Sequence, residues 1–154
     1  MKATQKTFVD FVDIDKEAIQ QIKINLIKNK IPSKRYRIYR SNMFFLLRNK
    51  KYDFVLANPP YVALKRIKEV DKEVLENEPW NALFAGEDGL LFIKKVLDKI
   101  DKHLKCVGYL FMEFDPLQRG EIEKILKMKF HNYRYRFEKD QYKKERFLIL
   151  QKLC

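Results

Sequence analysis

The sequence predicts an α/β domain built around a mostly parallel, doubly wound sheet. Apolar segments of strand-like composition alternate along the chain with segments of helical periodicity. Two of the apolar runs, residues 52–57 and 107–114, are nearly continuous, as buried strands of a parallel sheet usually are. No internal repeat or linker divides the 154 residues, so we expect a single domain over residues 1–154.

The first third of the chain contains two predicted strands with a helix between them. Residues 8–14 are rich enough in β-branched and aromatic residues to form a strand. Asp15 is placed to cap a helix that runs to about Asn29. Its apolar face is formed by Ala18, Ile19, Ile22, Leu26 and Ile27. Residues 36–39 predict a short strand, and residues 43–47 predict a short helical turn.

The rest of the chain continues the alternation. Residues 52–57 predict a buried strand, and a long polar stretch separates it from a helix over residues 90–104. The apolar strand over residues 107–114 is followed by a helix over residues 118–128. Two further strand candidates complete the chain, at residues 131–137 and 147–152.

The tetrapeptide Asn58-Pro59-Pro60-Tyr61 directly follows the strand predicted over residues 52–57. Ligands of open α/β sheets bind at the carboxyl ends of the strands. An NPPY loop in that place is typical of methyltransferases that modify a planar, conjugated nitrogen, such as a glutamine amide or an amino group of adenine or cytosine. The side-chain oxygen of Asn58 and a nearby backbone carbonyl can accept the two hydrogens of such an NH2 group. These bonds favour a pyramidal nitrogen whose lone pair points at a methyl donor.

The neighbouring residue types fit the same chemistry. Pro59 and Pro60 stiffen the loop and leave carbonyls without competing local donors. Tyr61 offers a flat face that can pack against a planar amide or base. The alternative interpretation is a Pro-rich turn that ends a strand, with Asn58 favoured for ordinary turn reasons. We prefer the functional interpretation.

Composition narrows the choice of partner and compartment. The formal net charge of +12 permits binding to nucleic acid, but the basic residues are spread along the chain, so we favour compositional bias as its origin. No segment approaches the ~20 apolar residues of a membrane span, and no signal peptide is visible. Cys106 and Cys154 show neither metal spacing nor a disulfide framework. We therefore predict a cytoplasmic protein with no metal site and no membrane partner.

Several segments fall in the order expected of one enzyme family. They are Val12-Asp13-Ile14 before a helix, Asn58-Pro59-Pro60-Tyr61, Glu78-Pro79 with Ala82-Leu83 and Gly86-Glu87-Asp88-Gly89-Leu90, and Glu113 with Gln118. Together they resemble the catalytic domain of the release factor glutamine methyltransferases, the HemK/PrmC family. The resemblance covers nearly all of the chain. The family's fold is a Rossmann-like sheet that binds S-adenosylmethionine.

The resemblance also implies a substrate and a set of site residues. The substrate would be the glutamine of the Gly-Gly-Gln loop in peptide chain release factors, which makes a release factor the expected partner. Asp13 would bind the cofactor ribose, because a carboxylate at the end of the second strand can accept both ribose hydroxyls. The remaining residues that would contact the cofactor are Ile14, Asn42, Met43 and Asn58. The residues that would carry catalysis and contact the substrate are Asn58, Pro59, Pro60 and Tyr61, with Glu78 as a further substrate contact.

Two features keep alternatives open. The NPPY sequence is shared with adenine-N6 methyltransferases of nucleic acid, although the position of residues 86–90 about one helix-length downstream favours the glutamine enzymes. The stretch over residues 86–90 can also be an ordinary glycine-bounded turn in which Asp88 caps the next helix. Both interpretations of this stretch can hold together.

The largest departure from the family is the Gly-rich cofactor loop that follows its first strand. None of the four glycines precedes Asp13, so we expect an N-terminally truncated domain without the first βα unit and the N-terminal helical domain. Losing a central strand would leave two strand edges unpaired. The flanking strands could close up, another polypeptide or a second copy could supply the strand, or the chain could be a fragment or split half, which we favour. A non-catalytic fragment would keep the NPPY surface but bind little cofactor. Asn42, where the family usually has an acid, is a tolerable departure.

Overall fold

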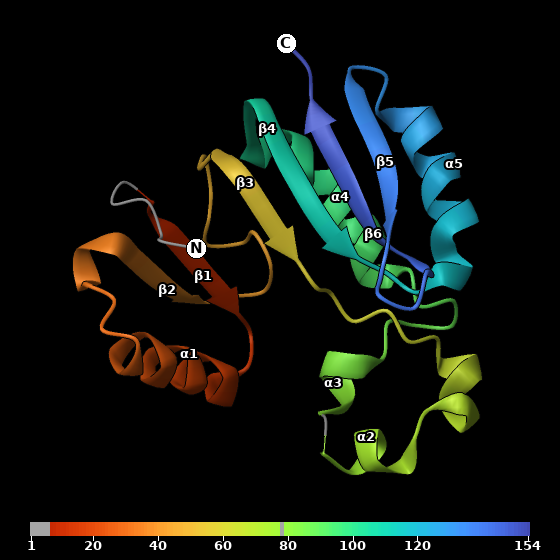
Figure 1. Ribbon diagram of the computed structural model, residues 1–154, viewed down its shortest axis with the longest axis horizontal. Coiled ribbons are helices and arrows are strands. Elements are labelled where there is room, and N and C mark those ends of the chain that lie inside the picture. Colours follow the sequence, from red (N-terminus) through yellow and green to blue (C-terminus); the bar gives the residue numbers. More distant parts are fainter. Residues whose placement is uncertain (1–6, 78) are drawn as a thin grey trace. The chain divides into compact units, whose positions relative to one another are not determined.

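The computed structural model describes residues 7–77 and 79–154 and divides into two compact units, residues 1–48 and 49–154. Figure 1 shows the strands and helices of both units. Each unit combines parallel strands with helices, which confirms the α/β class predicted from the sequence.

The first unit is a two-stranded parallel sheet with a crossover helix. Strand β1 (Val9–Asp13) pairs with β2 (Tyr36–Arg40), and α1 (Lys16–Lys28) and the single turn η1 (Ser33–Arg35) connect them. The predicted cap is confirmed, because the Asp15 carboxylate accepts hydrogen bonds from the backbone N–H groups of Glu17 and Ala18. The helical turn expected over residues 43–47 is wrong: the chain forms tight turns there, with Met43 in the left-handed region at φ 50°.

The second unit has a four-stranded sheet in the order β3-β4-β6-β5. Strand β3 (Tyr52–Ala57) runs parallel to β4 (Leu104–Glu113), and the connection between them includes helix α4 (Leu91–His103). Helix α5 (Arg119–Lys129) leads into β5 (Tyr133–Lys139) and β6 (Glu145–Lys152), which form an antiparallel hairpin. A short turn joins β5 to β6, as only antiparallel neighbours allow, and β6 also pairs antiparallel with β4.

The core of the second unit lies on one face of this sheet. Leu110 pairs with Leu150 and Met112 with Leu148, and these four side chains are fully buried. Helices α4 and α5 add further buried residues, including Ile93, Leu97, Ile100, Ile122 and Leu126. In Figure 1, α4 lies behind β4 and β6. Alternate residues of each strand therefore meet the helices.

The opposite face of the sheet is exposed, and the prediction that residues 52–57 form a buried strand is wrong in this respect. Strand β3 lies at the edge of its sheet, with Phe54 61% and Leu56 80% exposed. The ring of Phe54 stacks with that of Tyr109 on β4, with 6.0 Å between the centroids. The apolar run predicted a strand correctly, but an apolar sequence does not reveal whether both faces of the strand are covered.

The long polar stretch between β3 and α4, for which the sequence predicted no element, contains three short helices in its described residues. These are η2 (Leu64–Glu69), α2 (Lys72–Asn77) and α3 (Trp80–Leu83). The base of this excursion is closed by backbone hydrogen bonds, from Val62 N–H to the Leu83 carbonyl and from Leu64 N–H to the Gly86 carbonyl, both 2.9 Å. Each helix is too short for the sequence period to reveal it.

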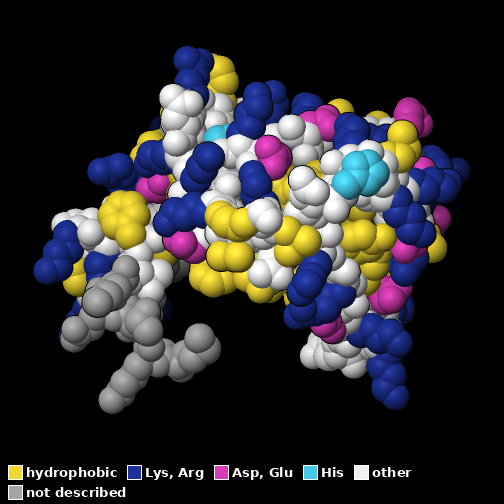
Figure 2. All heavy atoms as spheres, turned by 90° about the horizontal axis from the view of Figure 1, so that it is seen from above, with side chains coloured by type: hydrophobic (Ala, Val, Ile, Leu, Met, Phe, Trp, Pro, Cys, Tyr) yellow, Lys and Arg dark blue, Asp and Glu magenta, His cyan; other side chains and the backbone are white. Residues whose placement is uncertain are grey.

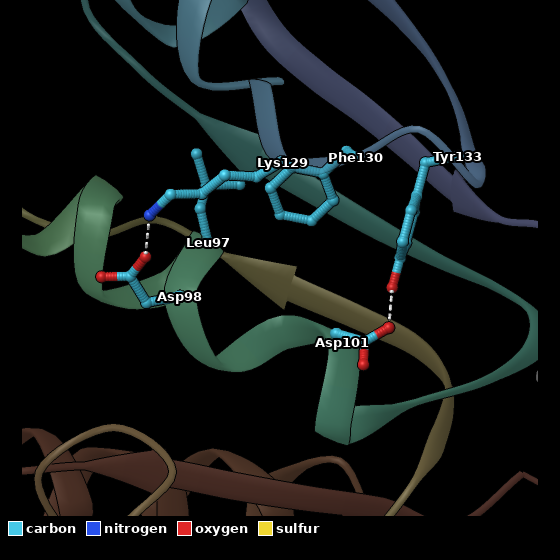
Figure 3. Close-up of a pocket in the computed structure, with 6 residues that line it drawn as sticks. All are labelled: Leu97, Asp98, Asp101, Lys129, Phe130 and Tyr133. Atoms are coloured by element: carbon cyan, nitrogen blue, oxygen red, sulfur yellow. Dashed lines mark hydrogen bonds and ion pairs between the residues drawn. The ribbon is translucent and has the colours of Figure 1, made fainter. Parts of the chain in front are cut away.

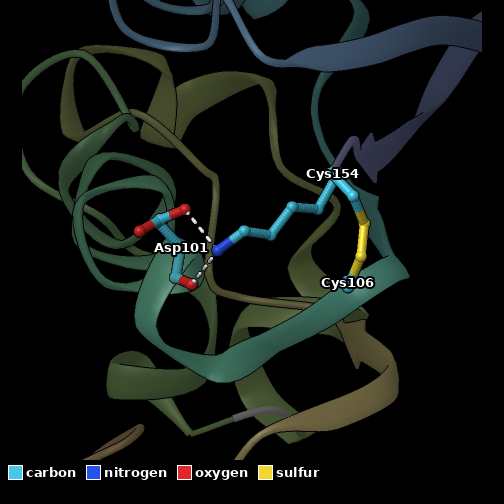
Figure 4. The surroundings of a disulfide bond; sticks show 4 residues. Asp101, Cys106 and Cys154 are labelled. Carbon is cyan, nitrogen blue, oxygen red and sulfur yellow. Dashed lines mark hydrogen bonds and ion pairs between the residues drawn. A yellow bond between two sulfur atoms is a disulfide. The ribbon is translucent and has the colours of Figure 1, made fainter.

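The expectation that Cys106 and Cys154 form no disulfide is also wrong. Their sulfur atoms are bonded, and their Cα atoms lie 5.5 Å apart (Figure 4). The cause is the antiparallel register, because continuing the β4–β6 ladder by three residues beyond the Tyr109–Gln151 pair brings the two cysteines opposite one another. Close by, the Lys152 ammonium contacts the Asp101 carboxylate at 2.7 Å.

The surface of the described chain is basic and has no dominant charged patch on the face drawn in Figure 2. Lys and Arg side chains are spread over that face, with hydrophobic side chains exposed between them. None of the described helices has the length and apolar character needed to cross a bilayer. The distribution of charge is in keeping with compositional bias as the origin of the net charge of +12.

A matched pair of substitutions tests the assignment of the two sheet faces. Leu110→Ala removes a fully buried side chain from β4 and should lower the free energy of unfolding by about 2–4 kcal/mol. Leu56→Ala makes the same chemical change at a side chain that is 80% exposed, and should change it by less than about 0.5 kcal/mol. Urea unfolding followed by circular dichroism measures both. Equal losses for the two variants would contradict this assignment.

Candidate active site

The Asn58-Pro59-Pro60-Tyr61 loop begins where β3 ends, at the carboxyl edge of the parallel β3–β4 pair. Figure 1 shows the arrows of both strands ending toward the same edge. Asn58 is exposed, Pro59 is buried, and Pro60 and Tyr61 are half-buried. The structure therefore leaves the carboxamide accessible while it packs the proline that follows.

Tyr61 is held by hydrogen bonds at its side-chain hydroxyl and at its backbone carbonyl. Its hydroxyl donates a hydrogen bond of 2.9 Å to Oε1 of Glu113, the last residue of β4. Its backbone carbonyl accepts a hydrogen bond of 2.8 Å from Nε2 of Gln118. Burial and the bond to Glu113 raise the pKa of the Tyr61 phenol above its usual value. The ring is thus a fixed part of the loop, and its hydroxyl is occupied.

The segment after β4 is shaped by a capping box. The Asp115 carboxylate accepts from the backbone N–H of Leu117 at 2.9 Å, while the Gln118 side chain accepts from the backbone N–H of Asp115 at 3.1 Å. The single turn η3 (Pro116–Gln118) begins at Pro116, a residue type that suits the first position of a helical turn. Arg66 reaches Asp115 from η2 at 2.7 Å. The turn that carries Gln118 is therefore fixed on both sides.

The Gly86–Leu90 stretch leads into α4. Gly86 and Gly89 have φ angles of 80° and 74°, a backbone conformation that residues with a side chain rarely adopt. Asp88 was expected to cap the helix, but its Oδ1 accepts from the N–H of Leu90, which itself occupies the N-cap position. The bond from Leu90, with the ion pair to Lys94, lowers the pKa of Asp88. Asp88 therefore orders the turn before the helix.

The predicted cofactor residues Asp13, Ile14, Asn42 and Met43 lie in the first unit. Asp13 ends β1, and its carbonyl accepts a hydrogen bond of 2.8 Å from the N–H of Ser41, which follows β2. The Asp13 carboxylate accepts from the N–H of Asp15 through Oδ1 at 2.9 Å. The parallel pairing thus brings the ends of both strands together.

An open hollow of about 410 Å³ lies beside these strand ends. It brings together two of the predicted cofactor residues, Ile14 and Asn42, and is further lined by Arg40, Ser41, Phe45 and Leu46. Ile14, Phe45 and Leu46 are exposed apolar side chains. Asp13, which directly precedes Ile14 in the chain, and Met43 are not among its lining residues. Apolar walls beside an amide suit a ligand with a flat ring and polar groups. The residues present therefore fit a nucleoside.

A second hollow of about 300 Å³ lies in the second unit and does not resemble a ligand site (Figure 3). Its polar side chains satisfy one another, since Lys129 contacts Asp98 at 2.7 Å and the Tyr133 hydroxyl donates to Asp101 at 2.6 Å. It borders the C-terminal half of α4, next to the start of β4. Ligand sites of α/β sheets lie at the opposite, carboxyl ends of the strands.

Sequence reasoning did not find all the residues that shape the NPPY loop. Glu113 and Gln118 were noted as parts of a family pattern, but their contacts with Tyr61 were not predicted, because they depend on how β3 pairs with β4. Glu78, the predicted further substrate contact, lies outside the described residues.

Comparison with known proteins gives one family and several relatives. A family model described as methyltransferase small domain matches residues 1–144. A release factor glutamine methyltransferase of Fusobacterium nucleatum is 36% identical over 116 residues, which cover 75% of this chain and 32% of that protein. One from Thermodesulfovibrio yellowstonii is 30% identical over 141 residues, which cover 92% of this chain and 50% of that protein. The resemblance to the release factor glutamine methyltransferases is thereby confirmed.

Solved structures show the fold. The catalytic domain of hMettl16 in complex with a MAT2A 3′UTR hairpin superposes with a TM-score of 0.67 at 16% identity, covering 95% of this chain and 55% of that one. SMU.1697c of Streptococcus mutans in complex with SAH superposes with a TM-score of 0.61 at 14% identity, covering 95% of this chain and 76% of that one. The predicted Rossmann-like methyltransferase fold is confirmed. The chain spans only 20% to 50% of the length of the curated relatives that it matches.

Removal of the Tyr61 hydroxyl tests the contact with Glu113. Tyr61→Phe should lower the free energy of unfolding by about 1–2 kcal/mol at pH 7, because the half-buried Glu113 carboxylate loses a donor. Tyr142→Phe, at a side chain that is 73% exposed, is the matched control and should change it by less than about 0.5 kcal/mol.

The raised pKa of Tyr61 adds a pH dependence to this comparison. The neutral phenol is favoured in the folded state, so its contribution is complete below the ordinary pKa of 10.0 and is lost as the pH rises through the higher folded value. Urea unfolding of the wild type and Tyr61→Phe should therefore differ less above pH 10 than at pH 7. A difference that grows with pH would refute the assigned contact.

Proposed function

We propose, because the chain belongs to the methyltransferase small domain family, that it carries the catalytic part of an S-adenosylmethionine-dependent methyltransferase. The proposed substrate is the amide nitrogen of the glutamine in the Gly-Gly-Gln loop of peptide chain release factors. The observation that carries this proposal is the anchored Asn58–Tyr61 loop at the carboxyl edge of β3 and β4. The names of the relatives, release factor glutamine methyltransferases, support the choice of substrate.

The first unit would hold the cofactor. Asp13 would accept hydrogen bonds from ribose hydroxyls, while Ile14, Asn42 and Met43 would line the nucleoside. The hollow beside the ends of β1 and β2 supports this assignment, because its lining combines apolar side chains with the Asn42 amide, and Asp13 directly precedes its lining residue Ile14. S-adenosylmethionine, when bound, supplies a methyl group on a positively charged sulfur. We further propose a single catalytic domain over residues 1–154, in which Asn58 also contacts the cofactor.

The second unit would hold the substrate amide. The Asn58 side-chain oxygen and the Pro59 carbonyl would accept the two N–H hydrogens, which concentrates the lone pair on nitrogen. Tyr61 would pack against the amide plane, with Pro60 keeping the loop stiff. The nitrogen lone pair would then form the new N–C bond to the methyl group, and the S–C electron pair would stay on the sulfur. The nitrogen then loses one proton to water, so no side chain has to act as a strong base.

Methylation of an adenine amino group is the second candidate. The NPPY loop alone serves either nitrogen, the net charge of +12 permits contact with phosphates, and the structural neighbour hMettl16 was solved with an RNA hairpin. This reaction would require a flipped base stacked on Tyr61. The Gly86–Leu90 stretch and the similarity to glutamine methyltransferases favour the release factor.

A third candidate is a fragment that keeps the substrate loop but does not hold the cofactor by itself. It would act only after another polypeptide segment supplies further cofactor contacts. Binding of the cofactor to the chain alone separates this candidate from the first. A cytoplasmic location, where release factors act, stays a prediction.

Titration of S-adenosylmethionine by calorimetry tests the cofactor assignment. The chain should bind it with micromolar affinity, and Asp13→Ala should weaken binding at least tenfold, or about 1.4 kcal/mol, through the loss of the ribose contacts. Asp53→Ala is the matched control, because Asp53 lies on β3 and pairs with Lys105 at the surface. No binding to a folded chain would favour the fragment, and equal affinity of the two variants would refute the role of Asp13.

Methyl transfer is tested with labelled S-adenosylmethionine and two substrates, a release factor with its Gly-Gly-Gln loop and an adenine-containing RNA. We expect label on the glutamine of the release factor. Asn58→Ala should lower the rate about 100- to 1,000-fold, as loss of a transition-state hydrogen bond does. Asn132→Ala, at an exposed turn, is the control. Label on the RNA instead would support the adenine reaction.

A further inference from the structure

The side chain of Gln118 is buried at 6% exposure and uses its whole amide group. Its Nε2 donates to the carbonyl of Tyr61 at 2.8 Å and to the carbonyl of Asp88 at 3.3 Å. Its Oε1 accepts from the N–H of Asp115 at 3.1 Å. One side chain therefore connects three segments, namely the NPPY loop, the turn before α4 and the turn after β4.

Gly89 lets these groups come so close. A Cβ atom added at Gly89 would overlap both the carbonyl oxygen of Tyr61 and Nε2 of Gln118. Neither of them can move aside freely, because the carbonyl is backbone and the amide is held by its other bonds. Gly89 also has a φ of 74°, which disfavours any side chain. The hydrogen bond from Gln118 to the Tyr61 carbonyl therefore requires a glycine at position 89.

The sequence of the loop explains why it needs an outside anchor. Pro59 and Pro60 have no N–H groups, so two successive residues cannot donate to any neighbouring backbone. After them, the backbone is next held at the carbonyl of Tyr61 and at the N–H of Val62, which donates to the carbonyl of Leu83. Gln118 thus supplies a donor at the first residue after the two prolines. The Tyr61 hydroxyl adds a second contact, with Glu113.

We propose that Gln118, assisted by Gly89, is a positioning residue that sets the backbone of the NPPY loop, so that Asn58 and the Pro59 carbonyl are fixed before substrate arrives. The inference rests on the proposed function of this loop, and it extends that function to a residue that touches neither substrate nor cofactor. Every bond of Gln118 lies within the second unit. The loop is consequently preformed in the free protein, which reduces the ordering cost of substrate binding.

The substitution Gln118→Met tests the proposal, because methionine keeps a similar length but cannot donate to the two carbonyls. Gln151→Met on β6 is the matched control in the same unit. Amide hydrogen exchange is measured by NMR in the free protein at Val62 and Leu64, whose N–H groups close the base of the excursion. Gln118→Met should speed exchange at both amides at least tenfold, while amides of α4 and β6 keep their wild-type rates.

Unchanged exchange at Val62 and Leu64 in folded Gln118→Met would overturn the proposal. If that variant does not fold, Gln118→Asn takes its place, because it keeps the amide but withdraws it by one methylene group.

A methyl-transfer assay on the Gln118 variant then separates positioning from general packing. Its kcat should fall at least tenfold, and its dissociation constant for S-adenosylmethionine should stay within twofold of the wild-type value. A loss of cofactor affinity as large as the loss in kcat would also overturn the proposal. If the wild type transfers no methyl group, the proposed function fails, but the exchange rates still decide the role of Gln118.

Discussion

The parallel pairing of β3 with β4 is the constraint on which the candidate active site depends. It sets the register in which Ala57 lies opposite Met112, so the loop after β3 emerges beside the end of β4. Glu113 can then reach the Tyr61 hydroxyl, and Gln118 one turn later can reach the Tyr61 carbonyl. Contacts between residues more than fifty positions apart thus follow from one strand pair, because parallel strands end at the same edge of a sheet.

The two units divide the proposed chemistry between them. The first ends its parallel strands beside a hollow suited to a nucleoside, which Ile14 and Asn42 help to line. The second holds the Asn58–Tyr61 loop by neutral and charge-assisted hydrogen bonds, which place an accessible carboxamide on a fixed backbone. An enzyme gains most from groups that need no reorganisation during the reaction. In the proposed reaction, the anchoring of the loop by Glu113 and Gln118 would serve that purpose.

Much of this could be predicted from the sequence, because local patterns determine local structure. Hydrophobic periodicity predicted the bounds of most strands and helices to within a few residues, and Asp15 correctly marked the N-terminus of α1. The position of the NPPY loop at the end of a strand could be predicted because an apolar run ends directly before Asn58. The exposed face of β3, the Cys106–Cys154 bond and the partners of Tyr61 were missed. Each depends on which strands become neighbours and in which register, information that a single strand does not contain.

The central claim is that the Asn58 carboxamide binds the amide of a substrate glutamine. The most direct test follows the side-chain NH2 signals of Asn58 by NMR in the labelled protein while a Gly-Gly-Gln peptide is added, and then repeats the titration with Gly-Gly-Glu. The two peptides differ only in the group that the loop is proposed to bind. We expect the Asn58 signals to shift with the glutamine peptide and to stay in place with the glutamate peptide. Equal shifts with both peptides would contradict it.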